Sequence, residues 1–152
     1  MYDWRKDRLT RFGRTGPRIV CVGLNCTDHA AEQGAKLPAN AMLFARVANA
    51  LCGDGEDITF PREIGHVDAE AEPAVVIGLE VRDVAADAVL GVVHGYPCGN
   101  DMSARDLQLG HGQWFRGTSQ DTFCPIGPGI VPVDELGDAG DLRNPVRSSG
   151  RA

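Results

Sequence analysis

Two glutamates with one residue between them, Glu70 and Glu72, begin a segment that reads as a β-strand. Alternate side chains of a strand point to the same face of a sheet, so the two carboxylates would lie side by side. Close carboxylates repel each other, and partial burial pushes each toward protonation. A bound hard cation removes that cost, because carboxylate oxygens suit Mg²⁺, Mn²⁺ and Ca²⁺. The pair therefore indicates a site for a divalent cation.

A surface role would explain the same residues. Acidic side chains on an exposed sheet edge protect it against edge-to-edge association, and Asp68 lies on the same face of the predicted strand. A further carboxylate, Asp101, follows about thirty residues after the pair. It could complete a set of three cation ligands, or it could cap a short helix. The spacing alone leaves these alternatives open.

The bulk properties predict one soluble domain. The 152 residues can form a hydrophobic core, and 43% of them are hydrophobic. The net charge of −6 argues against nucleic acid as a partner. Residues 1–17 are rich in arginine and are expected to form a solvated basic arm. No segment is apolar enough to span a bilayer, and the N-terminus lacks the apolar core of a secretory signal, so we expect no membrane partner.

The cysteines indicate a reducing compartment. The five thiols, an odd number, stand at scattered positions and form no C-x-x-C pair: Cys21, Cys26, Cys52, Cys98 and Cys124. This pattern indicates neither a zinc knuckle nor a disulfide framework. Reduced and mostly buried thiols in the cytoplasm are the expectation.

The predicted strands are many and short, and the predicted helices are few. Strands are expected at 18–22, 57–60, 70–81, 92–98 and 129–133, and helices at 28–34, 84–90 and 103–109, while 42–48 could be a strand or one helical turn. Asp83 is the expected cap of the second helix, and Pro73 favours a sheet edge or a bulge. The predominance of short strands over helices argues against a doubly wound fold and predicts an α+β class that is mainly β.

Four segments together resemble the fumarylacetoacetate hydrolase (FAH) family. The run from Ile19 to Glu32 looks like the family's opening motif, and Glu70 to Gly78 resembles its E-x-E-L-A-V-V-I-G segment. Gly95 to Asp106 is similar to G-Y-x-x-x-N-D-x-S-A-R-D, and Gln113 to Pro128 is similar to Q-W-x-x-G-K-S-x-D-T-F-x-P-x-G-P. The resemblance covers about residues 18–143, in one order and with loops of suitable length.

The resemblance implies a fold and a chemistry. The fold would be a mixed β-roll or distorted barrel with short flanking helices. Glu70, Glu72 and Asp101 would bind Mg²⁺ or Mn²⁺, or Ca²⁺, and leave open positions for a small oxo-acid substrate. The metal would act as a Lewis acid for the enolate formed when a C–C bond breaks. The implied reactions are acylpyruvate hydrolysis, oxaloacetate-type decarboxylation or a related isomerisation; the alternative is a non-catalytic metal-binding remnant of the fold.

Further site residues follow from the matched motifs. His29 and Glu32 stand one helical turn apart, so their side chains can meet, either as a surface pair or as a dyad in which the carboxylate raises the basicity of the imidazole. Their place in the opening motif favours the dyad, which activates water in hydrolytic family members. Arg105 and Gln108 would contact substrate by resemblance, although ordinary polar positions on a helix would explain both.

This chain departs from the family pattern at several positions. Thr118 stands where the loop motif has its lysine, so a cation for the substrate is missing, and Arg116 could replace it only if the loop shifted. Ala69, Pro73 and Cys26 replace a tyrosine, a leucine and a second tyrosine of the motifs. The activity is therefore expected to be impaired.

The C-terminal end also differs from the family. Residues 144–152 lack apolar periodicity and are expected to be a disordered tail, whereas family members continue through further strands and a helix. The chain thus resembles a C-terminally truncated or degenerate member. Its fold would be incomplete at the C-terminus, and an exposed sheet edge or apolar surface would favour a homodimer.

Overall fold

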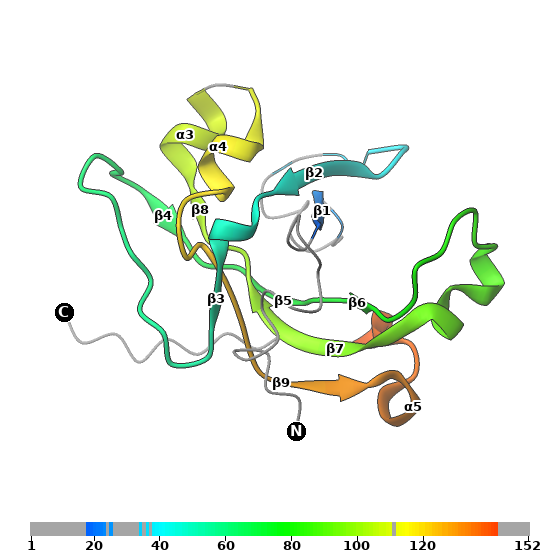
Figure 1. Ribbon diagram of the computed structural model, residues 1–152. Coiled ribbons are helices and arrows are strands. Elements are labelled where there is room, and N and C mark those ends of the chain that lie inside the picture. Colours follow the sequence, from blue (N-terminus) through cyan, green and yellow to red (C-terminus); the bar gives the residue numbers. More distant parts are fainter. Residues whose placement is uncertain are drawn as a thin grey trace.

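The protein is built from short strands in three sheets, with short helices at their margins (Figure 1). This computed structural model describes residues 18–23, 25, 34, 36, 38–110 and 112–142. The largest sheet has the strand order β3 (Leu51–Gly53), β9 (Cys124–Pro132), β7 (Val93–Asn100) and β5 (Ala71–Pro73), and β6 (Val76–Ile77) also pairs with β7. The β3–β9 pair is parallel and the other pairs are antiparallel, so the sheet is mixed.

Two smaller sheets join distant parts of the chain. β1 (Ile19–Gly23) pairs antiparallel with β2 (Met42–Arg46), and β4 (Val67–Asp68) pairs antiparallel with β8 (Ser103–Ala104). The strands of the described residues do not close into a barrel. The predicted class, α+β and mainly β, is confirmed.

The helices are short. α3 (Arg105–Gly110) and α4 (Trp114–Thr118) pack against each other at one end of the large sheet, and α5 (Val133–Leu136) lies at the other end (Figure 1). The described residues also form three 3₁₀ helices: η2 (Ala48–Ala50), η3 (Ala86–Val92) and η4 (Ala139–Asp141). None of the described helices has the length and apolar character needed to cross a membrane.

Several predicted element boundaries are wrong, and proline explains one of them. The strand expected over 70–81 is divided into β5 and β6, which both lie along the same edge of β7, and the register shifts at Val76 and Ile77. Pro73 ends β5, an edge position where a residue without an N–H is tolerated. Contact with β7 continues at the next residue, because the Ala74 N–H donates to the Pro97 carbonyl at 3.0 Å. The expectation of an edge or bulge at Pro73 is confirmed.

Other corrections concern strands and caps. No strand forms at 57–60, while β3 forms at Leu51–Gly53 and pairs with a segment more than seventy residues away. β9 begins at Cys124 rather than at Gly129, and α4 forms where no helix or strand was expected. Asp83 does not cap the following helix: its φ of 54° is in the left-handed region, and the residue before η3 is Ala85. The helix expected at 28–34 falls almost entirely outside the described residues.

Two small clusters of buried residues form the core of the described structure. One contains Ala50, Leu51 and Cys124, and the other contains Met102, Ala104 and Phe123. Phe123 is fully buried, and the Phe60 ring meets it edge-on at 5.9 Å between ring centroids. The second cluster packs beside β8 and α3, so it supports the turn that carries Asp101.

We expect Phe123→Ala to lower the free energy of unfolding by about 3–5 kcal/mol, because truncating a buried aromatic side chain leaves a cavity. Urea denaturation followed by circular dichroism measures this change. Phe115→Ala is the matched control, since Phe115 is 46% exposed and its truncation should change stability by about 0.5 kcal/mol or less. Equal losses in the two variants would contradict the assignment of the core.

Candidate metal centre

Three carboxylates meet where β5 pairs with the end of β7. Glu70, Glu72 and Asp101 each place an oxygen so that all three atoms lie within 4.8 Å of one another. The backbone sets this arrangement: the Asp101 N–H donates to the Glu70 carbonyl at 2.8 Å, and the Glu70 N–H donates to the Asn100 side-chain oxygen at 3.1 Å. We call these three residues the acidic triad. Its ligand chemistry, three carboxylates on two adjacent segments, suits a hard divalent cation.

The burial of the triad is graded. Asp101 is buried, Glu70 is half-buried and Glu72 is exposed. A cation held by the triad would therefore be open toward solvent on the Glu72 side. This openness provides coordination positions for a small molecule.

Arg105 organises the Glu70 side of the triad. Its Nη2 donates to Glu70 Oε1 at 2.7 Å, its Nε donates to Asp68 Oδ2 at 2.7 Å, and its Nη1 donates to Gln108 Oε1 at 2.6 Å. Burial alone would lower the pKa of Arg105, but the bonds to Asp68 and Glu70 outweigh it and raise that pKa above its ordinary value. The guanidinium thus stays charged and fixes one oxygen of Glu70.

Asp68 is not part of the triad and instead pairs with Arg105 and His66. It accepts from Arg105, and its Oδ1 lies 3.4 Å from His66 Nε2. The sequence placed Asp68 on the same face as the two glutamates, and in the structure it serves as a counter-charge for Arg105.

Arg46 is the site residue that sequence reasoning missed. It ends β2 with a side chain fully buried and paired with Asp101. Its Nη1 donates to the Phe123 carbonyl at 2.7 Å, and its Nη2 donates to the Met102 carbonyl at 3.2 Å. In the sequence, Arg46 is recognisable only as a charged residue at the end of the apolar run Met42–Ala45. This pattern does not indicate which carboxylate pairs with it.

The substrate-contact residues predicted from the motifs are placed as follows. Gln108 is buried on α3 beside Arg105. Thr118 is fully buried at the end of α4, where its hydroxyl donates to the Trp114 carbonyl at 3.1 Å. The two helices approach closely through Gly117, where a Cβ would lie 2.7 Å from the Gln108 nitrogen. His29 and Glu32 lie outside the described residues, so their role stays a prediction, as do the roles of Gln108 and Thr118.

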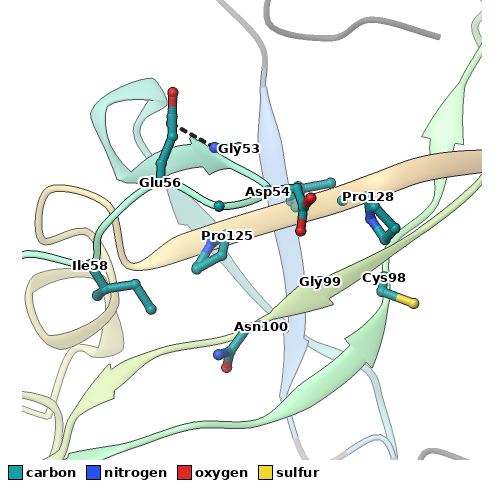
Figure 2. A pocket seen from close by; sticks show the side chains of 12 residues that line it. Gly53, Asp54, Glu56, Ile58, Cys98, Gly99, Asn100, Pro125 and Pro128 are labelled. Atoms are coloured by element: carbon teal, nitrogen blue, oxygen red, sulfur yellow. Dashed lines mark hydrogen bonds between the residues drawn. The ribbon is translucent and has the colours of Figure 1, made fainter.

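A separate hollow of about 220 Å³ lies between the 53–58 loop and the strands β7 and β9 (Figure 2). Cys98, Gly99 and Asn100 of β7 line it, and Gly99 is the cross-strand neighbour of Glu72. The acids of the hollow, Asp54 and Glu56, are not among the three residues of the triad.

Comparison with known proteins identifies the family. A family profile described as fumarylacetoacetate (FAA) hydrolase C-terminal matches residues 18–151. With most of the chain matched, the protein belongs to the fumarylacetoacetate hydrolase family. The match confirms the family that the four sequence motifs resemble.

Relatives with names that specify reactions are similar over most of the chain. A mitochondrial oxaloacetate tautomerase of Rattus norvegicus is 39% identical over 134 residues, which is 88% of this chain and 43% of the relative. A 2,4-didehydro-3-deoxy-L-rhamnonate hydrolase of Sphingomonas sp. (strain SKA58) is 42% identical over 126 residues, which is 82% of this chain and 44% of the relative. The chain thus spans less than half the length of these relatives.

A solved structure agrees with the fold. The X-ray structure of 5-carboxymethyl-2-hydroxymuconate delta-isomerase from Mycobacterium smegmatis superposes with a TM-score of 0.68 and 40% identity. The superposition covers 76% of this chain and 46% of that one.

The thiols near Arg46 are kept neutral. Burial raises the pKa of Cys21 to about 11, although the Arg46 charge works in the opposite direction. Burial likewise raises the pKa of Cys124 above its ordinary value. The thiolate is the reactive form of cysteine, so neither residue is set up as a nucleophile.

We expect slow alkylation of Cys21. A pKa raised from 9.0 to about 11 leaves roughly 100-fold less thiolate at pH 8 than an unperturbed thiol has. Its labelling by iodoacetamide should be slow in the folded protein and should accelerate toward pH 11. Peptide mapping by mass spectrometry at several pH values gives the rates, with the exposed Cys98 as the internal reference. Labelling of Cys21 as fast as Cys98 at pH 8 would contradict its burial.

Proposed function

We propose that this chain is the metal-binding part of an enzyme that acts on small oxo-acids. The proposed reactions are the hydrolysis or decarboxylation of a C–C bond or a related isomerisation. The observation that carries the proposal is the acidic triad, whose three ligand atoms lie within 4.8 Å of one another. Family membership supports it, because a family profile covers residues 18–151.

The ion that we propose is Mg²⁺ or Mn²⁺, with Ca²⁺ as a third hard cation for the same donors. Glu70, Glu72 and Asp101 would hold it, and the bound ion would supply a Lewis acid for a substrate oxygen. Arg105 fixes Glu70 from the protein side and keeps its charge. Gln108, held by Arg105, offers its amide N–H groups to a substrate carboxylate.

The proton transfer is assigned to the opening motif. We propose His29 as the general base and Glu32 as the carboxylate that orients its imidazole. Both come from the sequence motif. Burial raises the pKa of Cys21 and of Cys124, so neither thiol is our candidate for this role.

The names of the relatives support the class of substrate. They specify oxaloacetate, a didehydro-deoxy-rhamnonate and a carboxymethyl-hydroxymuconate, all of which are carboxylic acids. A carboxylate with a neighbouring oxygen can chelate a metal through two atoms, which uses the open side of the triad.

The alternative function is a metal-binding remnant without turnover. Thr118 supports it, since a neutral hydroxyl that already donates to the Trp114 carbonyl stands in place of a lysine. Replacing a charged donor by a neutral one weakens an anion contact by about half.

We also propose that the chain forms a homodimer in the cytoplasm. Supporting this assembly, β1 and β2 expose apolar side chains on one face, with Val20 63% and Leu43 65% exposed. The sedimentation coefficient would distinguish a dimer from a monomer.

Metal binding is tested by charge-neutral replacement of two ligands. We expect the parent protein to bind one Mn²⁺ or Mg²⁺ per chain, and Glu70→Gln/Glu72→Gln to lose that binding in isothermal titration calorimetry. The matched control is Asp54→Asn/Glu56→Gln, which removes the same charge from two acids that do not belong to the triad. Equal affinity of the parent and the triad variant would remove the basis of the proposal.

Catalysis is tested with Mn²⁺ present, on oxaloacetate and on an acylpyruvate. If the chain turns over either compound, His29→Ala should lower kcat by roughly 10²–10⁴-fold, the usual contribution of a general base. Steady-state assays with equal metal loading give the rates. Metal binding without any turnover would favour the remnant, and an unchanged rate in His29→Ala would exclude the proposed base.

A further inference from the structure

We propose that Arg46 is a positioning residue of the metal centre, which holds Asp101 in place and partly neutralises the triad. This role rests on the proposed metal-binding function. It assigns to β2, a strand that contributes no metal ligand, a direct influence on metal affinity.

The first argument is the burial of a full charge. The Arg46 side chain is 0% exposed and that of Asp101 is 10% exposed. A buried guanidinium is strongly unfavourable unless a carboxylate pairs with it and hydrogen bonds satisfy its donors. Asp101 is the carboxylate in contact with Arg46 among the ion pairs of the described residues. The charge of Arg46 is therefore directed at a proposed metal ligand.

The second argument is the set of segments that Arg46 connects. From β2 its Nη1 reaches the Phe123 carbonyl at 2.7 Å, just before β9, and its Nη2 reaches the Met102 carbonyl at 3.2 Å, next to Asp101. One planar group thus fixes the backbone beside Asp101 as well as its side chain. A lysine could supply the charge but could not make this fork of contacts.

The third argument concerns the two oxygens of Asp101. Its Oδ1 contacts Arg46 and lies 3.5 Å from the Ser103 hydroxyl. Contacts at one oxygen restrict rotation of the carboxylate and leave the other oxygen to face a cation. Protein groups that hold a ligating carboxylate in this way typically contribute about 10–100-fold to metal affinity.

The fourth argument is the balance of charge. The triad carries three negative charges, and Arg46 reduces them to two, which one divalent cation neutralises. Arg105 does not alter this balance, because Asp68 offsets it.

Arg46 also has structural contacts, because its terminal nitrogens donate to two backbone carbonyls and its side chain interacts with the thiols of Cys21 and Cys124. The contact with Asp101 is the one that joins it to the triad.

Calorimetry with Mn²⁺ tests the proposal on the full chain. We expect affinity to fall about 10–100-fold in Arg46→Met, and less in Arg46→Lys, which keeps the charge without the fork. Tyr96→Phe is the control. It removes the 2.9 Å hydrogen bond from the Tyr96 hydroxyl to the Gly137 carbonyl, a bond that lies on β7 and does not involve the triad. Its affinity should equal that of the parent. Thermal melts fix a temperature at which every variant is folded.

Each outcome decides the proposal. The order parent, Arg46→Lys, Arg46→Met in decreasing affinity supports it. If Arg46→Lys binds Mn²⁺ as tightly as the parent, the proposal is overturned. This comparison remains decisive even if Arg46→Met does not fold. A similar loss in Tyr96→Phe overturns the proposal as well, since affinity would then follow general stability. A parent that binds no Mn²⁺ overturns the metal-binding function and the role of Arg46 together, whereas a binding parent with unaffected Arg46 variants overturns the role alone.

Discussion

Repulsion among three carboxylates is the constraint on which the site depends. Glu70, Glu72 and Asp101 have ligand atoms within 4.8 Å of one another, a separation at which like charges destabilise a partly buried site. The fold opposes this repulsion from two sides, with Arg105 on Glu70 and Arg46 on Asp101. Glu72 is the exposed member, so the triad is open on the side where solvent and a cation have access.

The acidic triad was predictable because its information is local. Glu70 and Glu72 follow the period of a strand, and Asp101 falls in a recognisable motif. The surrounding shell was not predictable, since its contacts join residues far apart in the chain: Arg46 bonds to carbonyls 56 and 77 residues away. No pattern around Arg46 encodes those distances. Arg105 and Gln108 were found by motif, but the division of Arg105 between Asp68 and Glu70 required the fold.

The fold prediction was likewise correct where the information is local in the sequence and wrong where an element depends on pairing between distant segments. The class followed from the abundance of short β-rich runs, and the edge position of β5 followed from the missing N–H of Pro73. The strand β3 was missed because its three residues form a strand only by pairing with β9, which begins at Cys124. The run 57–60 has β propensity but finds no ladder partner in the described structure. Tertiary pairing overrides propensity in segments this short.

The position of the triad also couples metal binding to stability. β5 has three residues and pairs with β7 along one edge. Asp101 lies next to the core cluster of Met102, Ala104 and Phe123. An ion shared by Glu72 and Asp101 would tie β5 to this well-packed region. Since a ligand that binds the folded state stabilises it by an amount set by its concentration and affinity, this stabilisation would act most strongly on β5. Metal affinity and the order of this edge are therefore two measures of one interaction.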